Sequence, residues 1–82
     1  MLTDYINAAM HKAHYEFLKE DKVFYGEIPL LQGVIATGNN LEDCREELQS
    51  VLEDWIIISL QFNDPIPEID GILFKPKQLV NA

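Results

Sequence analysis

Apolar residues near the start of the chain recur every three to four positions, and this spacing predicts a short N-terminal helix. Thr3 suits the N-cap of this helix, and Lys12 places a cation near its end, where the helix dipole favours one. The apolar positions of the helix are Tyr5, Ile6, Ala9 and Met10. The spacing then changes to two, which predicts a strand over residues 13–18.

Two further strands are predicted before the middle of the chain. The β-rich run from Val23 to Ile28 follows a polar turn, so we expect it to pair with the first strand as an antiparallel hairpin. A third short strand is predicted between Gly33 and Gly38, because most residues between these two glycines are β-branched. Strands that follow one another so closely predict a meander.

A long helix is predicted to begin at Leu41. Asn40 suits its N-cap, and Asp43 occupies the position three residues later that completes a capping box. We expect one stripe of this helix to pack on the sheet, because its residues keep helical spacing. The stripe consists of Leu41, Cys44, Leu48, Val51, Leu52, Trp55, Ser59 and Phe62.

The segment after the long helix is rich in turn-forming residues, among them Pro65, Pro67 and the pair Asp70-Gly71. Residues 72–74 are predicted to form a fourth strand. The predicted fold class is therefore α+β in the order α-β-β-β-α-β. It consists of a three-stranded antiparallel meander and a fourth strand packed on one long helix, with a short N-terminal helix.

Three apolar residues of the long helix, Ile56, Ile57 and Leu60, are predicted to lie away from the core stripe. A helix that is apolar on all sides is usually buried on all sides, and one sheet covers only one of them. Two interpretations remain open. Either the N-terminal helix or the C-terminal segment packs there, or these residues form an interface in a homo-oligomer or with a partner.

Length and composition predict one ordered domain over residues 1–82, with hydrophobic residues making up 48% of the chain. The single cysteine, Cys44, cannot form an internal disulfide, and no secretory signal is visible, so we expect a cytoplasmic protein. The longest uninterrupted apolar run, from Trp55 to Ile58, is too short to span a membrane.

Fourteen acidic and six basic residues give a net charge of −8, which disfavours binding to nucleic acid and favours a basic partner or simple solubility. Many of the acids lie on the outer side of the long helix, where they form either a solvated surface or a docking surface for a basic protein. The predicted partner-binding residues are Glu42, Asp43, Glu46, Glu47 and Glu53, with Asp54 beside them.

Catalytic and metal-binding interpretations are weak. Glu16 and Glu27 lie on neighbouring predicted strands, but two-metal chemistry needs several converging acids, so exposed strand residues explain them better. His11 and His14 fall on either side of a predicted helix-to-strand junction, which does not assure the geometry of a zinc site. We therefore expect no enzyme activity, no metal site and no cofactor.

Several turn and packing residues follow one another in a characteristic order between residues 15 and 71. They are Tyr25-Gly26-Glu27-Ile28-Pro29, Gly33, Gly38, Asn40-Leu41-Glu42-Asp43-Cys44, Trp55 and Ile66-Pro67. In this order and spacing they resemble the HicB-type antitoxin family. The resemblance implies a partial ribonuclease H-like fold without its catalytic acids.

The same resemblance implies a function. Proteins of this family pair with a small, basic, RNA-cleaving toxin of the HicA type, block its active site, and commonly form dimers or tetramers. Many of them continue into a C-terminal DNA-binding segment, whereas this sequence ends eleven residues after Gly71. We therefore expect no direct binding to nucleic acid.

The first hypothesis for function is a non-enzymatic antitoxin of a type II toxin-antitoxin system, which neutralises a HicA-type toxin by direct protein binding. The alternative is an orphan homo-oligomeric domain that has a regulatory or binding role and no toxin partner. A neighbouring reading frame for a short, basic, histidine-containing protein would count against the alternative. The family motif marks no toxin contacts, so the contact residues named above rest on charge and exposure alone.

Overall fold

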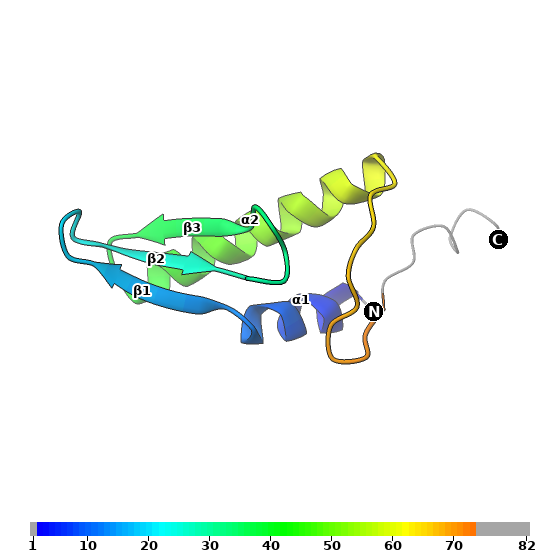
Figure 1. The fold of residues 1–82 in the computed structure, drawn as a ribbon, viewed down its shortest axis with the longest axis horizontal. Coiled ribbons are helices and arrows are strands. Elements are labelled where there is room, and N and C mark those ends of the chain that lie inside the picture. Colours follow the sequence, from blue (N-terminus) through cyan, green and yellow to red (C-terminus); the bar gives the residue numbers. More distant parts are fainter. Residues whose placement is uncertain (1, 74–82) are drawn as a thin grey trace.

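The chain forms a three-stranded sheet with one long helix across one of its faces (Figure 1). A computed structural model describes residues 2–73. The elements are α1 (Leu2–His11), β1 (His14–Leu18), β2 (Val23–Glu27), β3 (Ile35–Gly38) and α2 (Leu41–Gln61). The strands pair antiparallel in the order β1-β2-β3, so the predicted meander is confirmed.

The pairing register sets which side chains face α2. Gly26 of β2 lies opposite Tyr15 of β1 and Ala36 of β3, and all three point toward the helix. A Cβ atom on Gly26 would lie 2.9 Å from the Tyr15 ring and 3.1 Å from the Cys44 sulfur. The absence of a side chain at Gly26 therefore lets the sheet approach the first buried residue of α2.

The start of α2 is fixed by local hydrogen bonds, as the sequence predicted. The Asn40 side chain accepts a hydrogen bond from the Asp43 backbone N–H at 2.8 Å, and its amide donates to the Asp43 carboxylate at 3.1 Å. Gly38 at the end of β3 lies so close that an added Cβ would be 2.8 Å from the Cα of Cys44. The helix therefore begins in direct backbone contact with the strand that precedes it.

The core lies between α2, the sheet and two further segments. One buried stripe of α2 is formed by Cys44, Leu48, Leu52, Ile56 and Ser59. Residues of α1, of the loop between β2 and β3, and of the C-terminal segment complete the core, namely Tyr5, Ala8, Ala9, Met10, Ile28, Leu31, Val34, Ile66 and Ile69. The core therefore extends beyond the end of the sheet, where α1 packs against α2.

The prediction of a fourth strand is wrong for the residues described. Ile69 and Ile72 exchange two backbone hydrogen bonds, of 2.8 and 3.1 Å, around Asp70 and Gly71, whose φ angles of 51° and 78° suit a tight hairpin turn. This turn reverses the chain, so no fourth strand joins the sheet within residues 2–73. Phe74, the last residue of the predicted strand, lies outside the described residues.

The segment that precedes this turn is attached to α1 instead of the sheet. The Tyr5 hydroxyl donates a hydrogen bond of 2.6 Å to the carbonyl of Pro67. Pro65 and Pro67 have no backbone N–H to offer to a neighbouring strand, which disfavours sheet pairing here. Ile66 and Ile69 then bury their side chains in the core.

The predicted core stripe of α2 is right at its centre and wrong at its ends. Leu41 and Phe62 are 48% and 70% exposed, because they lie beyond the surfaces that cover the helix. Ile56, predicted to lie off the stripe, is only 2% exposed, and Leu60 is half-buried against the core. These two residues pack in the same core as residues of α1 and the C-terminal segment, as the intramolecular interpretation expects.

Candidate functional site

The exposed side of α2 carries a group of carboxylates that we call the acidic face. It consists of the five predicted partner-binding residues Glu42, Asp43, Glu46, Glu47 and Glu53, all of which are exposed. None of them forms an ion pair with another described residue. Asp43 is engaged in the N-cap, and Glu53 accepts a hydrogen bond from Gln49 at 3.3 Å. The acidic face therefore directs most of its charge toward solvent.

The acidic face extends over two different surfaces. Glu46 and Glu53 border a shallow depression on the outer side of the helix, with Gln49 and Ser50 between them. Asp43 and Glu47 instead turn toward β3. The sequence placed all these acids on one helix, but only the fold separates those that face solvent from those that face the sheet edge.

An open groove runs between the start of α2 and the free edge of β3. Its volume is about 470 Å³. The lining residues are Val23, Ala36, Thr37, Gly38, Asn39, Asp43 and Glu47, none of them basic. We call this the β3 groove. Reasoning from the sequence missed it, although the position of β3 as the last strand of a predicted meander was the available signal for a free edge.

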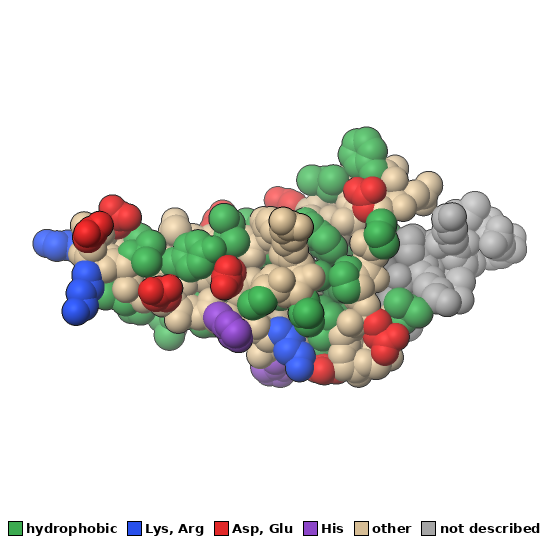
Figure 2. Space-filling view, viewed as in Figure 1, with side chains coloured by type: hydrophobic (Ala, Val, Ile, Leu, Met, Phe, Trp, Pro, Cys, Tyr) green, Lys and Arg blue, Asp and Glu red, His purple; other side chains and the backbone are tan. Residues whose placement is uncertain are grey.

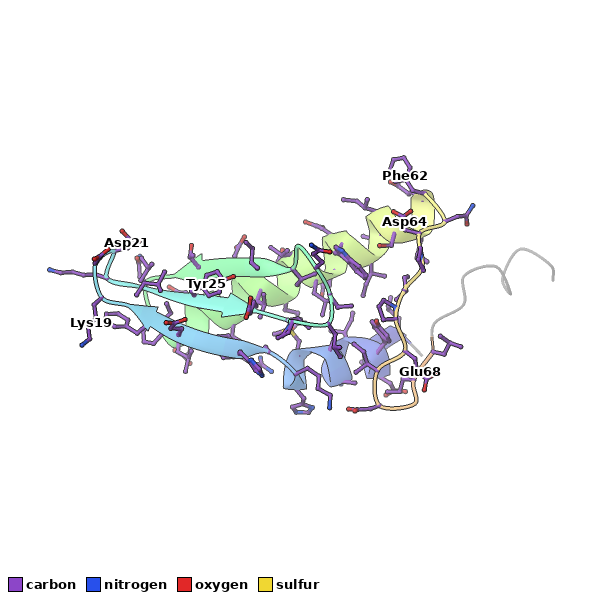
Figure 3. All side chains as sticks on the ribbon, in the orientation of Figure 1. Lys19, Asp21, Tyr25, Phe62, Asp64 and Glu68 are labelled. Atoms are coloured by element: carbon purple, nitrogen blue, oxygen red, sulfur yellow. The ribbon has the colours of Figure 1, made fainter. Side chains whose placement is uncertain are left out.

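The second half of α2 exposes apolar side chains. Ile57 and Ile58 are 53% and 52% exposed, and Phe62 lies at the far end of the molecule from the β1-β2 turn that carries Lys19 and Asp21 (Figure 3). Of the three predicted interface residues, Ile57 is available on the surface, Leu60 is half-buried and Ile56 is buried. Ile58 was missed, although it belongs to the apolar run from Trp55.

The sheet face opposite α2 carries both apolar and polar side chains (Figure 2). Glu16 lies opposite Tyr25 in the pairing, and the Tyr25 hydroxyl donates a hydrogen bond of 3.2 Å to Glu27. Partial desolvation and this carboxylate raise the pKa of Tyr25. Glu16 and Glu27 are thus surface residues of one sheet face, and Glu27 is engaged by a tyrosine.

The remaining candidate groups do not converge. His11 lies in the last turn of α1 and His14 is the first residue of β1. Within residues 2–73, no three histidine, cysteine, aspartate or glutamate side chains are arranged to hold a metal ion. Burial raises the pKa of the Cys44 thiol, which donates to the Ala36 carbonyl with a sulfur-to-oxygen distance of 3.7 Å, so this cysteine is a buried neutral thiol.

The described part of the chain contains no helix with the length and hydrophobicity that a membrane crossing requires. Its architecture defines a small two-layer α+β protein whose prominent surfaces are the acidic face, the β3 groove and an apolar end of α2. Residues 4–67 match the UPF0150-like family. The chain belongs to that family.

Two known proteins are similar to this chain, and the first of them carries the name of the family. The chain is 36% identical over 59 residues to the UPF0150 protein ssl0259 of Synechocystis sp. (strain ATCC 27184 / PCC 6803 / Kazusa), a match that covers 72% of this chain and 81% of that protein. The fold of this chain is similar to the crystal structure of TTHA0281 from Thermus thermophilus, with a TM-score of 0.84 and 39% sequence identity. That similarity covers 90% of this chain and 91% of the other.

Proposed function

We propose that this chain is a non-enzymatic, antitoxin-like binding protein of a type II toxin-antitoxin system. In this proposal it neutralises a small, basic, RNA-cleaving toxin of the HicA type by direct protein contact. The observation that carries the proposal is the acidic face, because its exposed carboxylates have no cationic partner among the described residues. A basic protein would supply that partner and bind faster at low ionic strength.

Two further points support the proposal. The chain resembles HicB-type antitoxins in the order of its turn and packing residues, and the UPF0150 family is related to HicB-like proteins. Three antiparallel strands followed by a long helix are also in keeping with the small α+β fold that the resemblance implies, although its fourth strand does not form within residues 2–73.

The first test uses the HicA-type protein that this proposal expects to be encoded beside the gene. Its catalytically inactive form should bind the purified chain in isothermal titration calorimetry. A variant with Glu42→Gln, Glu46→Gln, Glu47→Gln and Glu53→Gln should bind at least tenfold more weakly. Asp43 is left unchanged, because its side chain also contributes to the N-cap of α2.

The matched control removes the same number of charges elsewhere. It carries Glu16→Gln, Asp64→Asn, Glu68→Gln and Asp70→Asn, all exposed and outside the acidic face and the β3 groove; Asp64 and Glu68 are labelled in Figure 3. This control should keep the affinity within about threefold, since distant exposed charges are largely screened at physiological salt. Equal losses in both variants would reduce the effect to net charge, and no binding by the native chain would refute the toxin partner.

The alternative function, an orphan homo-oligomer without a toxin, is favoured by Ile57 and Ile58. These adjacent apolar side chains are exposed, and burial in a self-interface would remove their surface from water. Light scattering at two salt concentrations tests this assembly. We expect an oligomer that is insensitive to salt and that Ile57→Glu dissociates; a native monomer would exclude self-association through this surface.

A further inference from the structure

We propose, building on the function above, that the basic partner adds an extended strand to the free edge of β3 and seats it in the β3 groove. β3 is the last strand of the sheet and pairs only with β2 among the described residues. Edge strands present unpaired backbone N–H and C=O groups. An extended segment of another protein can form hydrogen bonds with these groups and so continue the ladder of the sheet.

The free backbone groups of β3 follow from the alternation of an antiparallel ladder. The Ile28 N–H donates to the Val34 carbonyl at 3.1 Å, so the backbone N–H and C=O groups of Val34 point toward β2. Two residues further, Ala36 faces β2 as well, so Ile35 and Thr37 direct their N–H and C=O groups to the open edge. These two residues would bond to the added strand.

Charge selects β3 over β1, the other edge of the sheet. On the β1 side, Arg45 lies close enough to Tyr15 to lower the pKa of its hydroxyl, against the larger raising effect of burial. The β3 groove instead contains Asp43 and Glu47 and no basic lining residue. Asp43 and Glu47 therefore attract a basic strand to β3.

The spacing of the two carboxylates fits alternate residues of a strand. Asp43 and Glu47 are separated by about one helical turn, roughly 6 Å along α2. Side chains on one face of a strand repeat every two residues, roughly 6.6 Å apart. Lysine or arginine at two alternate positions of the added strand would meet these carboxylates, while the intervening side chains lie beside Ile35 and Thr37 on the opposite face.

A second copy of this chain fits the same edge less well. Two-fold pairing of β3 with its own copy would place Asp43 and Glu47 of both molecules along one seam. Like charges brought opposite one another oppose association, and neither copy supplies a cation to this groove. A basic strand removes that repulsion and gains attraction.

Amide hydrogen exchange with the inactive HicA-type protein tests the proposal. In the complex, the amide protons of Ile35 and Thr37 should exchange at least about tenfold more slowly than in the free chain, because a new ladder protects them. Unchanged exchange at both residues in a complex that forms would overturn strand addition and leave the proposed function standing. Failure of the native chain to bind at all would overturn both.

Two substitutions separate the β3 groove from the net charge of the protein. Glu47→Lys should weaken binding at least tenfold, whereas Glu68→Lys, the same charge change at an exposed residue outside the acidic face and the β3 groove, should weaken it less than threefold. The reverse order would overturn the proposal. Thr37→Pro removes an outward N–H and should abolish binding, and circular dichroism tests whether this variant folds. If it does not fold, the exchange measurement on the native chain remains decisive.

Discussion

The two halves of α2 differ in charge and in what covers them. In the first half, from Leu41 to Ser50, the fully buried side chains are Cys44 and Leu48, and four of the other eight residues are exposed acids. The second half, from Val51 to Gln61, has buried or half-buried residues on a wider arc, because α1 and the C-terminal segment pack there in addition to the sheet.

This difference separates stability from recognition along one helix. The second half holds together parts of the chain that are distant in sequence, so substitutions of its buried residues should change folding. The first half uses few core residues, and its acids Glu42, Glu46 and Glu47 are exposed, so substitutions of these acids should leave the fold intact and change binding. Each prediction below tests this division, beginning with the largest expected effect.

Two adjacent isoleucines in the second half should respond very differently to truncation. Ile56→Ala should lower the free energy of unfolding by about 2–5 kcal/mol, because it leaves a cavity where α2 meets the rest of the core. Ile57→Ala removes the same atoms from an exposed position and should change the free energy of unfolding by less than about 0.5 kcal/mol. Urea denaturation of the two variants measures the difference, and similar losses would contradict the burial assigned to Ile56.

Gly38 tests how the first half of α2 is attached to the sheet. Gly38→Ala places a Cβ against the backbone of Cys44, which cannot move without displacing the helix start. We expect a loss of about 1–3 kcal/mol from this overpacking. Thermal denaturation measures it. A loss below about 0.5 kcal/mol would mean that the first half of α2 shifts away from β3 easily.

Local features of the fold were predictable from the sequence, and contacts between distant segments were not. Asn40 and Asp43 lie three residues apart, so their mutual hydrogen bonds could be expected from spacing alone. Ile56 belongs to a core that also contains residues of α1 and of the C-terminal segment, and the attachment of that segment to α1 joins Tyr5 and Pro67 across 62 positions. The periodicity of α2 carries no information about that contact.

The same limit applies to the candidate site. The acids of α2 were placed correctly on its exposed side, because helical geometry relates residues that are close in sequence. Which of them face the β3 groove depends on the path of β3 beside the helix. The sequence alone therefore did not show that Glu47 faces the groove while Glu46 lies on the outer side of the helix. The turn at Asp70-Gly71 was likewise predicted, but the surface on which it packs was not.

The N-cap offers a smaller test of the first half. Asn40→Ala removes the side chain that accepts from the Asp43 N–H and should lower the free energy of unfolding by about 1 kcal/mol. Its neighbour Asn39 is exposed, so Asn39→Ala serves as the control and should have little effect. Urea denaturation compares the two, and equal stabilities would show that the helix start depends on contact with β3 instead of the cap.

The smallest effect should be a gain in stability. Glu42 and Glu46 are four residues apart on one helix surface, and such like-charge pairs destabilise a helix by roughly 0.2–0.5 kcal/mol. Glu46→Lys replaces this repulsion with an attractive pair and should raise the free energy of unfolding by roughly 0.5 kcal/mol at low salt, a gain that added salt reduces. Glu46→Gln, which only removes the repulsion, should gain about half as much. Stabilisation by both substitutions would mean that the native acids are unfavourable for the isolated fold, as expected of charges whose partner is another molecule; destabilisation would assign Glu46 a structural role and contradict the division of α2 into two halves.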